Sequence, residues 1–149
     1  MTPCAVALAG VERLAVDTAP VIYLVEQHPT YAPIVREVFR RIDGGQILGF
    51  TSAVTLTELL VLPLQKGDVA LAQTYRDILL QNAQFSVRNV DPAVAEEAAR
   101  LRSKYRVRTP DAIQIATAIC LQCDALLTND AALQQVTEMP VLLVSELAP

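Results

Sequence analysis

Apolar residues along this chain fall into two kinds of segment. Short runs, such as LAV at 14–16, are apolar at consecutive positions, which is typical of strands buried on both faces of a parallel sheet. Longer segments place apolar residues about one helical turn apart, as at Ile34, Val38 and Ile42, which predicts helices. We expect strands at residues 14–17, 46–52, 85–90 and 125–130, and a fifth within 140–147.

Cap residues and prolines mark the ends of the segments with helical spacing. The pairs Asp–Pro at 91–92 and Thr–Pro at 109–110 each indicate a helix start, because proline is tolerated in the first turn. Asp68 is a candidate N-cap, and Pro63 predicts a kink or a break. The predicted helices cover residues 19–27, 31–43, 53–67, 68–82, 91–105 and 109–123.

Strands that alternate with helices predict one α/β domain spanning residues 1–149. We expect a three-layer α/β/α sandwich around a central, mostly parallel sheet of about five strands. A chain of 149 residues suits a single core, and 52% hydrophobic with 19% charged residues excludes a disordered protein. No apolar stretch approaches the length of a membrane helix and the N-terminus lacks a basic leader, so we expect a cytoplasmic protein.

Four acidic residues fall where this fold would bring them together. Asp17 and Asp130 end the first and fourth predicted strands, and Asp111 lies in the first turn of a helix. Glu58 lies one turn into the helix that follows the second strand, in an otherwise apolar segment. In an open parallel sheet, ligands bind outside the carboxyl ends of the strands, and all four acids are expected at that edge.

Each acid also has an ordinary structural interpretation. Asp17 can cap the helix that follows it, and Asp130 can cap a short helix beginning at Ala131. Asp111 can favour the dipole of its helix. Glu58 is the hardest to explain in this way. The convergence of all four on one edge carries the functional interpretation, since four independent coincidences are improbable.

Carboxylates gathered in one cleft repel one another, and a divalent cation removes that penalty. Oxygen ligands without a partnering His or Cys suit the hard ions Mg²⁺ or Mn²⁺. Ions held in this way commonly serve phosphate chemistry. The net charge of −4 argues weakly against a general nucleic-acid coat and leaves room for a local basic patch.

Four segments carry a resemblance to a known family. LAVDTAPVIYLVEQHP, TSAVTLTELL, RTPDAIQIATAI and ALLTND resemble, in order and at familiar intervals, the acidic motifs of the PIN domain family. The resemblance covers essentially the whole chain and is closest to the VapC toxins of type II toxin–antitoxin pairs. Two features depart from the pattern: Ala19 stands where a Ser is common, and the segment before the first strand is longer than in many toxins.

This resemblance implies a Mg²⁺- or Mn²⁺-dependent endoribonuclease with a small antitoxin partner and a homodimeric state. It implies Asp17 and Asp111 as main metal ligands, Glu58 as the residue that completes the pocket, and Asp130 as a ligand bound directly or through water. Either Glu58 or Asp130 orients the attacking water. The supporting polar residues that it implies are Thr18, Thr128 and Asn129.

Basic residues for the phosphate backbone are concentrated in the segment RLRSKYRVR at 100–108. Arg108, Arg106 and Lys104 are the candidate RNA contacts, with Arg108 the best placed, and Tyr105 can stack on a base. The alternative is a solvated helix end, where basic residues favour the dipole.

Other chemistry has weaker support. His28, the only histidine, precedes Pro29 and is expected to be an exposed loop residue. Cys120 and Cys123 lack a second pair or a nearby His, so zinc is not expected and the thiols are expected to be reduced.

Three alternatives to the toxin remain open. One is a PIN nuclease of RNA processing or repair, and another is an inactive PIN module that binds RNA or a protein partner. The third, a receiver-like or dehalogenase-like domain, needs a functional lysine near the site. Lys66 and Lys104 are the only lysines, and neither follows a predicted strand.

Overall fold

Five strands form the central sheet of the computed structural model, which describes residues 1–149. They are β2 (Arg13–Val16), β3 (Leu48–Ser52), β4 (Phe85–Arg88), β5 (Ala125–Thr128) and β6 (Val141–Leu143). Their order in the sheet is β4-β3-β2-β5-β6, and every neighbouring pair is parallel. The predicted fold class and all five predicted strands are confirmed.

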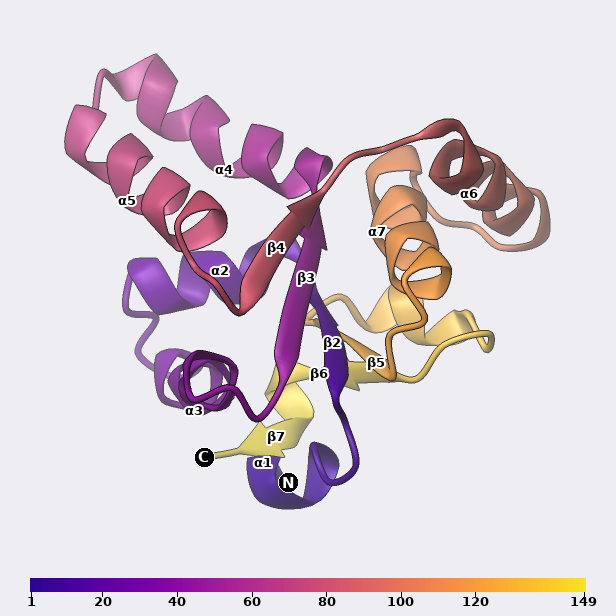
Figure 1. Ribbon diagram of the computed structural model, residues 1–149, viewed down its shortest axis with the longest axis horizontal. Helices are drawn as coiled ribbons and strands as arrows, with labels where there is room; N and C mark the ends of the chain where they lie inside the picture. The colour runs from indigo at the N-terminus through magenta and orange to yellow at the C-terminus, as the bar shows by residue number, and fades with distance from the viewer.

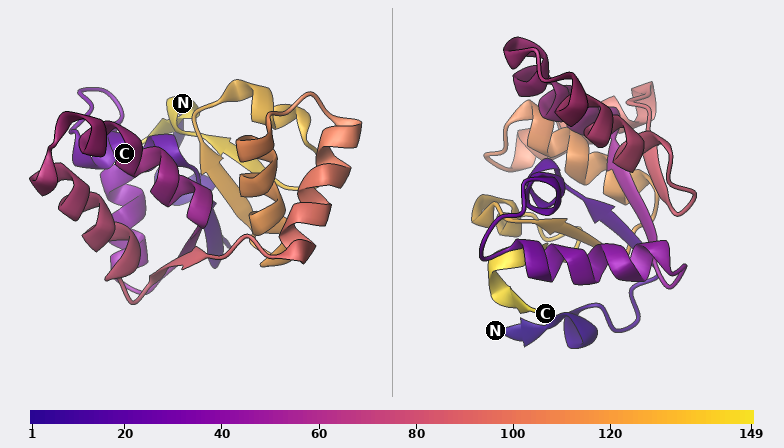
Figure 2. Two further views of the ribbon diagram at one scale, coloured as in Figure 1. Left: turned by 90° about the horizontal axis from the view of Figure 1, so that it is seen from above. Right: turned by 90° about the vertical axis from the view of Figure 1, so that its left-hand side faces the viewer.

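Helices cover both faces of this sheet. One layer contains α2 (Thr18–Val25), α3 (Ala32–Asp43), α4 (Ala53–Lys66) and α5 (Val69–Leu80), and the other contains α6 (Pro92–Lys104) and α7 (Thr109–Cys120). Figure 1 shows these two layers on opposite sides of the strands, and Figure 2 shows them in two further views. The strands therefore face apolar helices on both sides, as their continuous apolar sequences predict.

Two hydrophobic cores follow from the alternation of side chains along β2. Leu14 and Val16 belong to a cluster of 19 buried residues under α2–α5, whereas Ala15 belongs to a cluster of 15 under α6 and α7. Successive residues of a strand point to opposite faces, so this single strand contributes to both cores.

Several short elements lie outside the predicted pattern. The termini pair as a parallel two-stranded sheet of β1 (Thr2–Pro3) and β7 (Leu147–Ala148) (Figure 1). The short helix α1 (Cys4–Ala7) directly follows β1. Two 3₁₀ helices, η1 (Ala131–Gln135) and η2 (Val144–Glu146), flank β6. Elements of two to five residues are too short to show a periodic pattern.

The predicted helix over 53–67 is confirmed, and of the kink or break predicted at Pro63 the break is absent, since α4 continues to Lys66. Pro63 lies in the last turns of the helix, where its missing N–H removes a single hydrogen bond, and its carbonyl accepts from Asp68 N at 2.9 Å. Asp68 caps α5 as predicted, accepting from Leu71 N at 3.0 Å. The longest helix, α4, has 14 residues, and no helix has the length and hydropathy of a membrane span.

The strand order reverses between β2 and β5. From β2 the chain proceeds through β3 to β4 on one side, and it later adds β5 and β6 on the other. After β2 the chain enters α2, whose Val21 packs in one core, and after β5 it enters η1, whose Leu133 packs in the other. Such a reversal is where open α/β sheets bind ligands. Asp17 follows β2, and Asn129 with Asp130 follows β5 at this point.

Gly49 is a close packing point between β3 and its neighbours. A Cβ atom there would lie 2.5 Å from Phe85 Cδ2 and 3.0 Å from Ile42 Cδ1. We therefore expect Gly49→Ala to lower the free energy of unfolding by about 1–3 kcal/mol, the usual cost of overpacking. Urea denaturation measures this loss.

The double variant Gly49→Ala/Phe85→Leu provides the control, because a smaller side chain at position 85 makes room for the new methyl group. Its loss of stability should be smaller than the sum of the two single losses. Strict additivity would contradict the close contact as the cause.

Candidate functional site

Asp17 is the most buried acid at the carboxyl edge of the sheet, with 8% of the residue exposed. The predicted strand extends to Asp17, but β2 ends at Val16 because Asp17 takes the N-cap position of α2. Its Oδ1 accepts from Thr18 N at 2.8 Å, and its Oδ2 accepts from the Thr128 hydroxyl at 2.8 Å. The capping interpretation and the proposed ligand role therefore coexist in one residue.

Thr128 connects Asp17 to the loop after β5. Its Oγ1 also accepts from Asp130 N at 3.2 Å, and Asp130 Oδ1 accepts from Ala132 N at 3.0 Å, which caps η1. The predicted strand over 125–130 is two residues too long, because the backbone turns into this capped 3₁₀ helix after Thr128. Asp130 is held beside the strand end by both contacts.

Asn129 holds the same loop from its other side. Its Oδ1 accepts from Ser145 N at 2.9 Å, and its Nδ2 donates to the Tyr23 hydroxyl at 3.1 Å. The loop after β5 is therefore tied to α2 and to the segment after β6. These contacts give Asn129 a supporting position next to Asp130.

Glu58 reaches this edge from α4. Its Oε1 accepts from the Thr18 hydroxyl at 2.7 Å, and Thr18 directly follows Asp17. Glu58 is exposed, while Thr18 is buried. Thr18 therefore joins two of the candidate acids through its backbone and its side chain.

A set of hydrogen bonds between buried polar side chains, which the sequence patterns did not predict, supports Thr18. The Thr55 oxygen lies 3.3 Å from the Thr18 hydroxyl and accepts from the Thr51 hydroxyl at 2.7 Å and from Gln114 Nε2 at 2.5 Å. Gln114 is 2% exposed. A glutamine within the apolar helix of IQIATAI was the available signal, because a buried amide needs hydrogen-bond partners.

Asp111 lies in the first turn of α7, as predicted, and its carboxylate is paired with a basic side chain. Arg108 Nε donates to Asp111 Oδ2 at 3.1 Å, with the Arg108 side chain 77% exposed and that of Asp111 14% exposed. The hydrogen bond to Asp111 raises the pKa of the Arg108 guanidinium, and the charges of Glu58 and Asp130 raise it further. Arg108 therefore lies within the field of three acids.

Burial and like charges both act on Asp17. Loss of solvent raises the pKa of its carboxyl group, the hydrogen bonds from Thr18 and Thr128 lower it, and the charges of Asp111 and Glu58 raise it. The net direction is upward. Acids from three separate parts of the chain thus interact electrostatically near the carboxyl ends of β2 and β5.

The chemistry of these side chains fits a hard divalent cation. All the candidate ligands are carboxylate oxygens, with hydroxyl groups beside them and no imidazole or thiolate. A dication would also offset the burial and the like charges that raise the pKa of Asp17. No three acids lie close enough together here to form a ready-made metal cage. Binding would therefore need side-chain movement, beginning with the Arg108–Asp111 pair.

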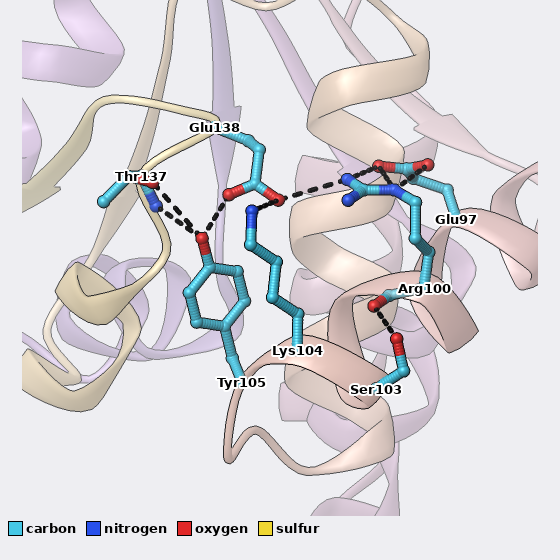
Figure 3. Close-up of polar contacts among 7 residues, drawn as sticks. All are labelled: Glu97, Arg100, Ser103, Lys104, Tyr105, Thr137 and Glu138. Carbon is cyan, nitrogen blue, oxygen red and sulfur yellow. Dashed lines mark hydrogen bonds and ion pairs between the residues drawn. The ribbon is translucent and has the colours of Figure 1, made fainter.

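Most basic side chains of the segment 100–108 have partners other than these acids, and Figure 3 shows Arg100 and Lys104 beside Glu138. Glu138 pairs with Arg100 at 3.2 Å and with Lys104 at 3.7 Å, and it accepts a short hydrogen bond from the Tyr105 hydroxyl. Lys104 and Tyr105 are thus engaged with the loop before β6. Arg106 is exposed. Arg108 is the basic residue of this segment that contacts a candidate metal ligand, Asp111.

His28 and the cysteines have structural surroundings. His28 lies in a loop, as expected, but its side chain is partly buried rather than exposed, and its ring stacks on that of Tyr31 with the centroids 4.6 Å apart. Its Nδ1 accepts from the backbone N–H groups of Thr30 and Tyr31. All three cysteines are free, as expected, with Cys123 buried and Cys120 exposed.

Because the pKa of Asp17 is raised, we expect a neutral side chain at this position to increase the stability of the folded protein. Where the folded pKa exceeds the unfolded one, the ionised form is disfavoured in the fold, so the charge costs stability at neutral pH. In EDTA at pH 7, Asp17→Asn should unfold a few degrees above the wild type, since Asn still caps α2. Below about pH 3 the carboxyl group is largely protonated in both states, and the difference should vanish.

Thermal unfolding between pH 3 and pH 8 tests this expectation. Asp68→Asn is the matched control, because it makes the same replacement at an exposed helix cap. An Asp17→Asn protein less stable than wild type at pH 7 would contradict the unfavourable burial of this charge.

Solved structures with this fold include three bacterial toxin or toxin–antitoxin proteins. VapBC2 of Rickettsia felis, bound to a promoter DNA fragment, aligns with a TM-score of 0.70 and 15% identity over 87% of this chain and 97% of that chain. VapC20 of Mycobacterium tuberculosis, a sarcin–ricin loop cleaving toxin, gives 0.67 and 16% over 85% and 99%. FitAcB of Neisseria gonorrhoeae gives 0.66 and 20% over 89% and 98%.

Identities of this size establish a shared fold. No curated protein matches the sequence significantly. The family model of the PIN domain matches residues 14–139, a span that contains all four candidate acids, the strands β3, β4 and β5, and β2 from Leu14 onward. This match agrees with the motifs read from the sequence, and the chain belongs to the PIN domain family.

Proposed function

We propose that this protein is a Mg²⁺- or Mn²⁺-dependent endoribonuclease and the toxin of a VapBC-type toxin–antitoxin pair. The observation that carries the proposal is the placement of Asp17 and Glu58 at the carboxyl ends of the strands, where they accept hydrogen bonds from the hydroxyl groups of Thr128 and Thr18 and lie within the electrostatic influence of one another and of Asp111. Membership of the PIN family and the fold shared with toxins, one of which cleaves the sarcin–ricin loop, support it.

The acids divide into ligands and helpers. Asp17 and Asp111 would hold the ion, Asp130 would contact it directly or through water, and Glu58 would complete the pocket. When bound, such an ion polarises the phosphoryl oxygen and stabilises the leaving oxygen. Thr18 and Thr128 donate hydrogen bonds to Glu58 and Asp17, and Asn129 holds the loop that carries Asp130 through its contacts with Tyr23 and Ser145.

Hydrolysis then needs a water molecule, a proton acceptor and a cation for the phosphate. Water attacks phosphorus, the P–O3′ bond breaks, and the products carry a 5′-phosphate and a 3′-hydroxyl. Glu58 or Asp130 orients the water and accepts its proton. Thr18 engages one oxygen of Glu58 and Ala132 engages one oxygen of Asp130, which leaves the second oxygen of each for this work.

Arg108 is the best placed cation for the phosphate backbone, because it already lies among the acids. Arg106 is exposed two residues before it and can contact a neighbouring phosphate. Lys104 would contribute at the periphery, since Glu138 partly neutralises it.

The same proposal includes an antitoxin partner and a homodimer. Among the apolar residues of α2 and α4, Val21 and Leu59 are buried in the core. Leu62, Leu64 and Val69, around the α4–α5 turn, are 50%, 61% and 78% exposed. A hollow of about 570 Å³ lies between α2, α3 and α5, and none of the four acids lines it. The exposed apolar side chains of Leu62, Leu64 and Val69 are of the kind found on protein contact surfaces.

Cleavage of a mixed RNA pool tests the nuclease. The wild type should cut with Mg²⁺ or Mn²⁺ and stop in EDTA. Asp17→Asn and Asp111→Asn should each lower the rate at least about 100-fold, because each removes a ligand carboxylate from the reacting centre. The matched control Asp68→Asn, at an exposed helix cap on the α4–α5 turn, should cut like the wild type.

Two outcomes would overturn this proposal in different ways. Cutting that persists in both variants would remove the acidic edge as the catalytic site. Failure of folded, metal-loaded and antitoxin-free protein to cut any RNA would favour a PIN module that binds without cleaving.

Glu58→Gln and Asp130→Asn separate the proton acceptor from a ligand. The variant that loses the acceptor should retain Mn²⁺ affinity in calorimetry while its cleavage rate falls at least about 100-fold. The variant that loses a ligand should lose affinity and rate together. If both variants keep the wild-type rate, neither residue accepts the proton.

A further inference from the structure

Arg108 stands out because a metal ligand proposed above already has a cationic partner. Its Nε donates to Asp111 Oδ2 at 3.1 Å, from a side chain that is 77% exposed. The contact therefore lies on the solvent side of the acid. Glu58 and Asp130 also act on the guanidinium, so one positive charge serves several carboxylates.

The backbone around Arg108 is fixed from two sides. Arg102 Nε donates to Val107 O at 3.1 Å, and an Arg102 terminal nitrogen donates to the Thr109 hydroxyl at 2.7 Å. Gln135 Nε2 of η1 donates to Arg106 O at 3.1 Å. Figure 3 shows the next anchor, where Tyr105 meets the loop that contains Glu138. We therefore expect a change in the partner of Arg108 to rotate its side chain while the backbone stays in place.

We propose that Arg108 is an exchangeable counter-ion, which neutralises Asp111 in the metal-free protein and is displaced when a divalent cation binds. The Asp111 oxygen that Arg108 engages is then free for the ion, and repulsion between the two cations moves the guanidinium outward. An exposed ion pair contributes little stability, so a dication can replace it.

The displaced guanidinium then becomes available to the phosphate of the substrate. Its planar donors match a phosphate in two-point contact. Metal binding and phosphate binding should therefore be coupled, and each should favour the other. This second half rests on the proposed nuclease function, whereas the exchange at Asp111 does not.

Calorimetry of Mn²⁺ binding tests the exchange. Arg108→Gln should bind Mn²⁺ about two- to fivefold more tightly than the wild type, because the ion no longer has to break an exposed ion pair. Arg106→Gln is the matched control, since it removes the same charge two residues away from an exposed position. An equal gain in both variants would overturn a specific exchange in favour of general electrostatics.

The arginine Nε–H resonances give a second readout that does not depend on activity. The Arg108 signal, identified by its absence from the spectrum of Arg108→Gln, should shift when Mg²⁺ saturates the protein. In Asp111→Asn it should be insensitive to Mg²⁺. A signal that stays unchanged while Mg²⁺ binds, or no Mn²⁺ binding by any variant, would overturn the inference. Exchange without RNA cleavage would instead overturn the proposed function and leave the counter-ion role intact.

Discussion

The hydrogen-bonded ladder between β2 and β5 is the interaction on which the rest of the site depends. It pairs Val16 with Leu127 and continues as Asp17 N donates to Leu127 O at 2.9 Å. One residue further on, the Thr128 hydroxyl donates to the carboxylate of Asp17. The backbone pairing of two strands far apart in sequence thus passes directly into the side-chain contacts of the acidic edge.

Gathering acids at this edge creates an electrostatic cost that the structure reduces in three ways. Helix N-termini donate N–H groups to Asp17 and Asp130, and hydroxyl groups donate to Asp17 and Glu58. Arg108 supplies the remaining positive charge at Asp111. All buried side-chain polar atoms have partners. Burial, and to a smaller extent the charges of Asp111 and Glu58, still raises the pKa of Asp17, which is the place where a cation has most to offer.

Sequence patterns predicted the elements well where the pattern was long or strongly marked. The helix starts at Pro92 and Thr109 and the cap at Asp68 were found because proline and aspartate have local, geometric reasons to stand there. The breaks and ends were less accurate: Pro63 does not end α4, and β5 stops at Thr128. Strand ends depend on which neighbour remains to pair with, and that neighbour lies elsewhere in the chain.

The sequence alone determined the alternation of strands and helices, the two-sided burial of the sheet and the positions of Asp17, Asp111 and Asp130 at the ends of elements. These follow from local periodicity and capping chemistry. Only the tertiary structure decided that β2 lies beside β5, that Thr55 and Gln114 support Thr18, and that Arg108 faces Asp111 while Lys104 faces Glu138. Neighbour relations of this kind arise from strand order and side-chain packing across the fold, which no local spacing encodes.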